Sequence, residues 1–181
     1  MSRVPDIKLE DLTTEQKRIY DEIAGPRGGV VRGPFPIWLR NPDLADRANQ
    51  FGNALRVHGK LEKRLFELMV LIVARHWSAQ YEWFSHAKSA LKAGLSPEIV
   101  EAIQNHRRPE SLGEDERLVY EIISELVETR TLSQPSYDRA LDALGLDLLI
   151  ELITAAGFYT MIAMVLNAFD APVPSDEQPL R

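Results

Sequence analysis

One stretch of the chain, from Glu67 to His86, constrains the fold more than any other. It begins inside the apolar run 65–74, in which Glu67 is the one charged residue. A helix that is apolar on nearly every side is expected to be buried. A carboxylate in such a helix needs partners, because an unpaired charge in an apolar site is expensive. If the segment 78–92 is also helical, Glu82 and His86 lie four residues apart on one helix face and are candidate ionisable groups of the same site.

Two interpretations of these ionisable side chains stay open at this point. In the first, a Glu–His or Glu–Arg pair simply ties two helices together, and Arg75 is a possible partner of Glu67. In the second, the same groups form a catalytic site. Ion-pair networks and catalytic sites both perturb pKa values, so the pattern alone does not separate the two.

The rest of the chain shows apolar residues at helical spacing and no convincing alternation with a period of two, which predicts an all-α fold. Thr13 or Thr14 can cap the first helix, Pro42 fits the first position of the second, and Gly94 and Gly145 fit helix ends. The expected helices cover residues 13–24, 42–57, 61–75, 78–92, 97–103, 114–129, 133–145 and 146–169.

The length of 181 residues suits a single domain. We expect its core over about 30–170, with residues 1–12 and 172–181 extended or frayed. The segment 25–36 holds four glycines and three prolines, so we expect a loop, either a functional lid or a simple connector. The two most apolar helices, 61–75 and 146–169, either form the core against each other or lie partly at a subunit interface.

Composition excludes several classes of function. The net charge is −6 and the basic residues form no stripe, so we expect no nucleic-acid partner. The chain has no cysteine, which excludes disulfides, thiolate nucleophiles and Cys-ligated zinc. We expect no uncharged segment of membrane-spanning length and no signal-peptide core, hence no membrane partner and a cytoplasmic location.

Several motifs together resemble the carboxymuconolactone decarboxylase superfamily, which includes the alkylhydroperoxidase D proteins. The resemblance covers about residues 30–170. It rests on Glu67, Val73-Ala74-Arg75, Tyr81-Glu82-Trp83 and His86, on 93–96 and Asn41–Ala45, and on Gly157-Phe158-Tyr159 with Asn167. The resemblance implies a multi-helix alkylhydroperoxidase D-like fold that assembles as trimers or hexamers, with its site near subunit contacts.

The peroxidase branch of that superfamily carries two cysteines between a Glu and a His. At the same spacing from Glu67 and His86, this chain has Ala79 and Glu82 in the two cysteine positions. Tyr81 falls between them. Because neither Ala nor Glu can form a thiolate, we expect no thiol peroxidase activity, although a family-level assignment would suggest one. The Tyr-Glu-Trp-x-x-His pattern is that of the decarboxylase branch.

The resemblance therefore implies a cofactor-free lyase, or a related hydrolase or isomerase, acting on a small carboxylic acid or lactone. The alternative is a non-catalytic oligomer that binds a small molecule or acts as a scaffold. In the lyase, His86 with Glu82 or Glu67 would be the acid/base pair, and Tyr81 would donate a hydrogen bond to a developing oxyanion. We expect burial to raise the pKa of Glu67 into a useful range.

Arginine and tryptophan side chains complete the expected site. Arg75 or Arg32 would hold the substrate carboxylate, and Trp83 would line the site. Packing is the alternative role of Tyr81 and Trp83. We expect neither cofactor nor metal, although Glu67, Glu82 and His86 could in principle ligate zinc.

Overall fold

The computed structural model describes residues 2–5, 7–174 and 178–180. All regular structure in these residues is helical, which confirms the predicted all-α class. The helical elements are η1 (Leu9–Asp11), α1 (Thr14–Ala24), η2 (Gly25–Arg27), α2 (Phe35–Trp38), α3 (Pro42–Arg56), α4 (Lys63–His76), α5 (Gln80–Lys92), α6 (Pro97–Gln104), α7 (Glu114–Thr129) and α8 (Gln134–Ala168).

The chain divides into two compact units. The first comprises residues 1–59 and 165–172, and the second comprises 60–164 and 173–181. The last residues of α8 thus belong to the first unit. The single-domain organisation expected from the sequence stays a prediction.

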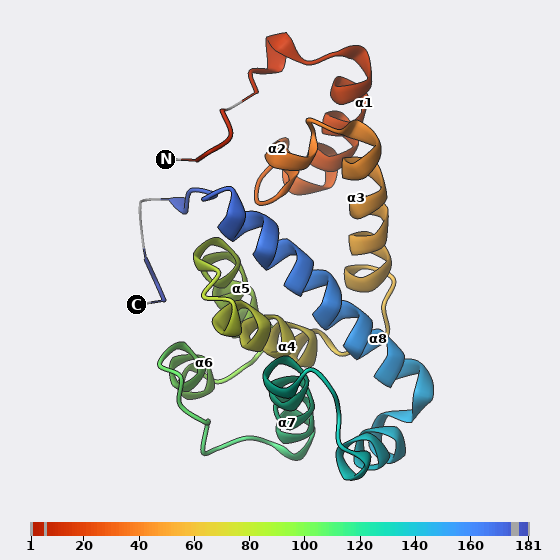
Figure 1. Cartoon of the computed structure of the whole chain (residues 1–181), viewed down its shortest axis with the longest axis vertical. Helices are drawn as coiled ribbons and strands as arrows, with labels where there is room; N and C mark the ends of the chain where they lie inside the picture. The colour runs from red at the N-terminus through yellow and green to blue at the C-terminus, as the bar shows by residue number, and fades with distance from the viewer. Residues whose placement is uncertain (1, 6, 175–177, 181) are drawn as a thin grey trace. The chain divides into compact units, whose positions relative to one another are not determined.

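The first unit is built on α1 and α3, which lie against each other (Figure 1). Thr13 caps α1 in a capping box with Gln16, and the Asn41 side chain caps α3 by accepting from the Leu44 amide at 3.2 Å. The segment 25–36 is less irregular than expected, because η2 and the start of α2 lie within it. Arg27 fixes it by donating to the Ile23 carbonyl at 2.7 Å and to Asn49 at 3.2 Å.

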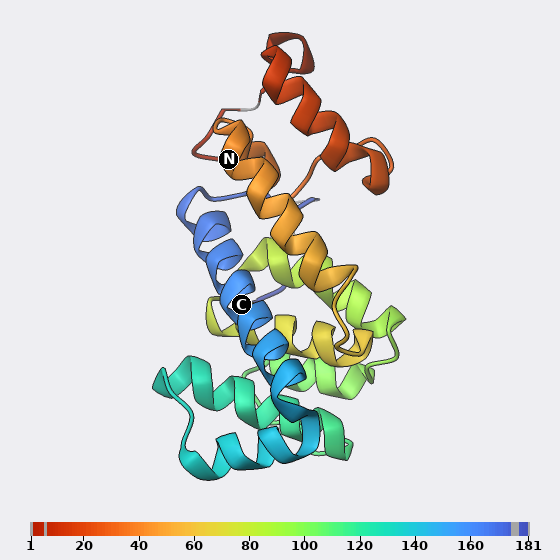
Figure 2. The same ribbon diagram turned by 90° about the vertical axis from the view of Figure 1, so that its right-hand side faces the viewer.

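The second unit is organised around α4. Every residue of α4 from Leu65 to Arg75 is buried, as the apolar run predicted. Helices α5, α6 and α7 pack against α4, and Figures 1 and 2 show α8 alongside α4 and α5. Glu151 of α8 fixes the entry to α4, since its carboxylate accepts from the amides of Lys60 at 3.0 Å and Leu61 at 2.8 Å.

Helix α8 consists of two helices joined at Gly145, which has φ 74° and ψ 165°. This break confirms the predicted helix end at that glycine, because a left-handed backbone conformation suits a residue without a Cβ atom. The second helix is apolar yet only partly covered. Its exposed apolar side chains within the second unit are Leu146, Ile150, Met161 and Met164.

This helix bears on the expectation that no uncharged segment reaches membrane-spanning length, but it carries charged residues such as Asp147 and Glu151 and therefore does not contradict that expectation. By length and composition α8 is apolar enough to cross a membrane, and 44% of its most apolar 18-residue window is buried inside the chain. A core helix of a soluble protein has the same properties, so the finding is weak evidence for a membrane span.

The described part of the C-terminal tail also differs from the expected frayed chain. Leu180 exchanges two hydrogen bonds with the Gln80 side chain, at 2.6 and 2.9 Å, and is 5% exposed. Gln104 donates to the Pro179 carbonyl at 2.6 Å. Residues 178–180 are therefore anchored on α5 and α6, whereas 175–177 and 181 lie outside the described residues.

Candidate functional site

A tight turn between α4 and α5 sets up the candidate site. Ser78 has φ 48°, in the left-handed region, and its amide donates to the Arg75 carbonyl at 3.0 Å. The Ala79 amide donates to the Ala74 carbonyl at 2.8 Å. These two hydrogen bonds end α4 and reverse the direction of the chain within the same turn. Helix α5 consequently returns along α4 and brings His86 opposite Glu67.

Glu67 and His86 form the centre of the site. Nδ1 of His86 lies 2.7 Å from Oε2 of Glu67, and the Glu67 side chain is 1% exposed. The other carboxylate oxygen, Oε1, lies 2.7 Å from Nζ of Lys63, one helical turn earlier on α4. Because Glu67 engages Nδ1, the second ring nitrogen Nε2 is the one available to a substrate.

The environment of Glu67 keeps its carboxyl ionised. Burial alone would raise the pKa of Glu67, but the hydrogen bonds and charges of His86 and Lys63 outweigh burial and hold the pKa below its ordinary value of 4.5. The expected upward shift of the Glu67 pKa is therefore wrong. The sequence analysis considered burial and not the two basic partners, whose effect has the opposite sign.

Aromatic rings complete the surroundings of the pair. The Tyr159 ring of α8 meets the His86 imidazole edge to face, with centroids 5.0 Å apart, and meets the Phe66 ring at 5.6 Å. Tyr159 is 2% exposed. The imidazole is thus fixed by a carboxylate on one side and by a buried aromatic ring on another, which restricts its rotation.

Glu82 lies in the first turn of α5, is 2% exposed and has no hydrogen-bond partner for either carboxyl oxygen among the described residues. A Glu at the third helical position often accepts from the N-cap amide. Here that amide belongs to Ala79 and already donates to Ala74. Burial raises the pKa of Glu82 well above its ordinary value of 4.5. The structure therefore favours a protonated Glu82 on the same helix as His86, while Glu67, the partner of His86, is ionised.

The predicted site residues are only partly brought together. Glu67 and His86 are in contact, which is one of the two pairings predicted for His86. In the described residues no hydrogen bond joins Glu82 to His86, and neither Glu82 oxygen has a partner. Tyr81 is half-buried at the start of α5, and Trp83 is buried at 2% exposure. No group of three or more His, Cys, Asp or Glu side chains in the described residues could hold a metal ion.

Neither of the two predicted arginines is among the hydrogen-bond or ion-pair partners of Glu67 and His86 in the described residues. Arg75 is eight residues beyond Glu67 on the same helix, about 12 Å along its axis, and lines a cavity that includes no member of the pair. The alternative Glu67–Arg75 ion pair is therefore wrong, since Glu67 pairs with Lys63 and His86. Arg32 is exposed and belongs to the other compact unit.

Sequence reasoning missed Lys63 and Tyr159 as members of the site. The spacing of Lys63 and Glu67, four residues apart in a predicted helix, was a usable signal for the first. Tyr159 belongs to a motif that supported the family resemblance, but its contact with His86 joins α5 to α8 and no local pattern indicates it.

Comparisons with known proteins agree with this architecture. Residues 42–125 match the carboxymuconolactone decarboxylase family. This match agrees with the resemblance to the carboxymuconolactone decarboxylase superfamily that the motifs predicted. No curated protein matches the sequence.

Two solved structures share the fold across nearly the whole chain. One is an uncharacterized peroxidase-related protein from Silicibacter sp. TM1040, with 14% identity, a TM-score of 0.80, and coverage of 98% of this chain and 94% of that chain. The other is a cysteine-to-alanine variant of the debrominase Bmp8 in complex with 2,3,4-tribromopyrrole. It has 14% identity, a TM-score of 0.77, and coverage of 99% of this chain and 96% of that chain. At this identity the likeness establishes the fold alone.

Proposed function

We propose that this protein is a cofactor-free lyase, or a related hydrolase or isomerase, that acts on a small carboxylic acid or lactone by acid/base chemistry. The observation that carries the proposal is the buried Glu67 carboxylate bound to Nδ1 of His86 at 2.7 Å. A carboxylate in this position holds the imidazole in one tautomer, with its proton on Nδ1, and leaves Nε2 for proton transfer with a substrate.

Two carboxyl groups with opposite pKa shifts support separate acid and base roles. Glu67 is held ionised by its basic partners, whereas burial favours the protonated form of Glu82. Environments that push the pKa values of neighbouring carboxyl groups apart are typical of acid/base pairs. In the proposal, the ionised Glu67 orients His86, and His86 and the protonated Glu82 are the two candidate proton donors.

Decarboxylation suits these side chains because the reaction requires little covalent catalysis by the protein. The carbon–carbon bond to the departing carboxylate breaks, CO2 leaves, and the electron pair enters the conjugated carbonyl system as a dienolate. A proton delivered to carbon then completes the product. His86 or Glu82 would supply this proton, and Tyr81 would donate a hydrogen bond to the developing oxyanion.

A cation beside the pair would hold the substrate carboxylate. Lys63 touches Glu67 and its side chain remains 53% exposed, so an incoming acid can reach its ammonium group. It is a better placed candidate than Arg75, which lies about 12 Å from Glu67 along the axis of α4. Trp83 is buried at 2% exposure and would support the site by packing in the core.

Turnover by a His86→Ala variant tests the proposal. Release of CO2 from a panel of aromatic-degradation acids and γ-lactone acids is measured for the wild-type protein, the variant and buffer. We expect the rate with the best substrate to fall by about 100-fold or more in the variant, because a positioned proton donor contributes that much. His58→Ala, which removes an exposed imidazole from the first unit, is the matched control and should retain full turnover.

Survival of turnover within a few-fold in His86→Ala would remove the imidazole from the mechanism. Absence of turnover with every acid and lactone would instead favour the second candidate, a non-catalytic binding or scaffold oligomer. One observation supports that candidate: the Glu67–His86 pair joins α4 to α5, as a purely structural pair would.

Thiol chemistry is disfavoured as a further alternative. The chain has no cysteine, so its own residues supply no thiol for peroxide reduction or for any thiol-dependent dehalogenation. The likeness to a peroxidase-related protein and to a debrominase therefore suggests a shared scaffold and not a shared reaction.

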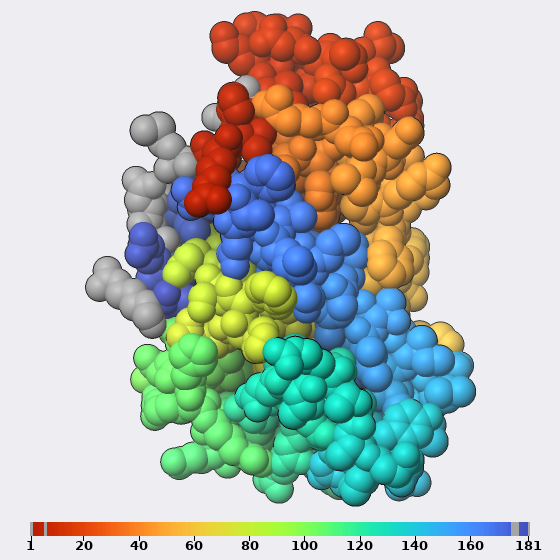
Figure 3. Space-filling model, in the orientation of Figure 1, coloured from red at the N-terminus to blue at the C-terminus, as the bar shows by residue number. Residues whose placement is uncertain are grey.

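The exposed apolar face of α8 supports the proposed homo-oligomer. Leu146 and Ile150 are 53% and 54% exposed, and Met164 is 51% exposed. Figure 3 shows α8, in blue, open on one face of the molecule. Apolar side chains aligned on one helix are typical of surfaces that pack against a second copy.

Light scattering of the purified protein tests this assembly. We expect the mass of a trimer or a hexamer of the 20.5 kDa chain. A Met164→Glu variant places a charge on the face and should shift the mass toward that of the monomer, because an unpaired charge is costly in an apolar interface. A monomeric wild-type protein would contradict the proposed assembly.

A further inference from the structure

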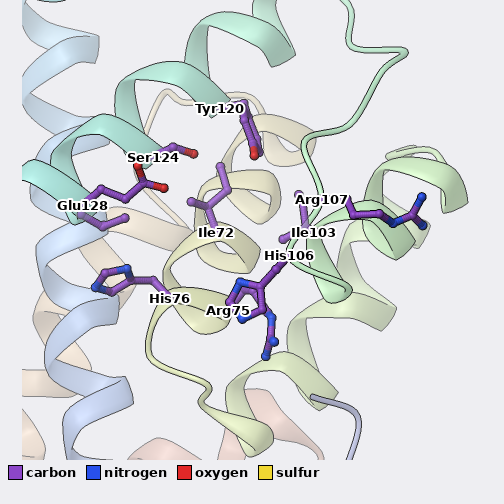
Figure 4. Close-up of a pocket in the computed structure, with 10 residues that line it drawn as sticks. Ile72, Arg75, His76, Ile103, His106, Arg107, Tyr120, Ser124 and Glu128 are labelled. Carbon is purple, nitrogen blue, oxygen red and sulfur yellow. The ribbon is translucent and has the colours of Figure 1, made fainter. Parts of the chain in front are cut away.

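A cavity that includes neither Glu67 nor His86 in its lining lies between α4, α6 and α7 (Figure 4). Its volume is about 260 Å³. The polar groups in Figure 4 come from three elements and surround the apolar side chains of Ile72 and Ile103. The polar lining consists of Arg75 and His76 from α4, His106 and Arg107 from the turn after α6, and Tyr120, Ser124 and Glu128 from α7.

The composition of this lining favours an anion. Arg75 supplies a permanent positive charge, whereas Arg107 lies 3.7 Å from the Glu101 carboxylate and is 63% exposed. Arg75 is therefore the main cation facing the single lining carboxylate, Glu128. Two imidazoles and two hydroxyls add hydrogen-bond donors. Glu128 can accept from a hydroxyl on a ligand, but it is exposed and so its charge is screened by water.

Arg75 is the distinctive member of the lining. It is 7% exposed, and its Nε is buried without a hydrogen-bond partner in the described residues. Burial lowers the pKa of its guanidinium, and no carboxylate offsets that effect. A buried guanidinium without a carboxylate is costly, so a bound oxyanion would supply a partner that the described chain does not.

The position of His106 has a backbone origin. Its φ is 54°, its amide donates to the Ile103 carbonyl at 3.0 Å, and the following Arg107 amide donates to the Ala102 carbonyl at 2.8 Å. These bonds place His106 at the left-handed position that ends α6, where glycine is the usual residue. The left-handed conformation costs a histidine about 1 kcal/mol relative to glycine. Unlike glycine, however, His106 contributes an imidazole to the cavity lining.

We propose that this cavity binds a small organic carboxylate, with Arg75 and His106 holding the anionic head and Ile72, Ile103 and Val127 meeting its apolar body. A planar guanidinium donates two parallel hydrogen bonds to a carboxylate. The volume is below that of sites for drug-sized ligands, which limits the ligand to about the size of a benzoate ion. This proposal does not depend on the function proposed above, because the two sites share no residue.

Titration calorimetry with benzoate tests the site, with the neutral analogue benzamide and inorganic phosphate as comparison ligands. We expect benzoate to bind at least about tenfold more tightly than benzamide, since the head group carries the recognition. Binding should also shift the Nε–H resonance of Arg75 in the NMR spectrum. Equal affinity for benzoate and benzamide would overturn the proposal, and binding of phosphate but not benzoate would overturn the assignment to an organic carboxylate.

Two variants locate the binding. Arg75→Gln should raise the dissociation constant for benzoate by about tenfold or more. His106→Gly removes the imidazole while suiting the left-handed backbone, so it keeps the test valid even if Arg75→Gln fails to fold. It should weaken binding several-fold. Arg56→Gln, at the exposed end of α3, is the matched control and should leave the affinity unchanged. Unchanged affinity in His106→Gly and in any folded Arg75→Gln protein would overturn the proposed site.

Discussion

Replacing Glu82 with methionine is expected to raise the free energy of unfolding at pH 7 by about 1–3 kcal/mol and to abolish turnover. The wild-type side chain is 2% exposed, and neither carboxyl oxygen has a partner among the described residues. Methionine has a similar length and no polar oxygen, so it removes the unsatisfied groups without leaving a large cavity. A gain in stability with a loss of activity is typical of a strained functional residue.

The pH dependence of stability distinguishes this account of Glu82 from simple packing. Because burial raises its folded pKa above 4.5, the stabilising contribution of Glu82 is fully present below pH 4.5. It is lost as the pH rises through the raised folded pKa. Chemical denaturation across this range should show a loss of stability in the wild-type protein that is absent from both Glu82→Met and Glu82→Gln. A Glu82→Met protein that is less stable than wild type at pH 7 would mean that the carboxyl has a stabilising partner.

Glu67→Gln is expected to lower the free energy of unfolding at pH 7 by about 1.5–3 kcal/mol, the usual value of hydrogen bonds to a charged group. The variant removes the charge that pairs with His86 and Lys63. We expect less than the loss for a fully buried ion pair, because Lys63 is 53% exposed and can return to water. Turnover should also fall, since the imidazole loses the group that orients it.

The acid side of the stability curve provides the measurement for Glu67. Its folded pKa lies below 4.5, so its contribution is present above pH 4.5 and is lost as the pH falls through the folded pKa. Acid denaturation of Glu67→Gln should lack this loss. Glu22→Gln removes one partner of the exposed Arg18–Glu22 pair and serves as the control, with an expected change below about 0.5 kcal/mol. Equal stability of the two variants at pH 7 would contradict the structural role of Glu67.

The sequence predicted the parts of this fold that depend on local pattern. The buried α4 helix, the start of α3 at Pro42 and the helix ends at Gly94 and Gly145 each follow from residues within a few positions of one another. The helix ends at Ser78 and His106 were not predicted as left-handed, because neither residue is a glycine. In both places the hydrogen bonds of the turn outweigh the backbone preference of the residue.

The candidate site was predictable only in part, for a physical reason. Spacing on a helix shows which residues share a face, and it therefore suggested pairing Glu82 with His86. It does not show which neighbouring helix that face meets. The turn at Ser78 brings His86 to Glu67, while Glu82 is buried with no hydrogen-bond partner in the part of the chain that the structure describes, so the two glutamates acquire opposite pKa shifts.

NMR of the His86 imidazole tests the central claim most directly, that the Glu67 carboxylate holds this ring in one tautomer. In the wild-type protein near neutral pH we predict a proton fixed on Nδ1, with a slowly exchanging resonance shifted downfield by the short bond to Glu67. The Glu67→Gln variant should lose that resonance. A wild-type imidazole that samples both tautomers, or a spectrum unchanged by Glu67→Gln, would contradict the account.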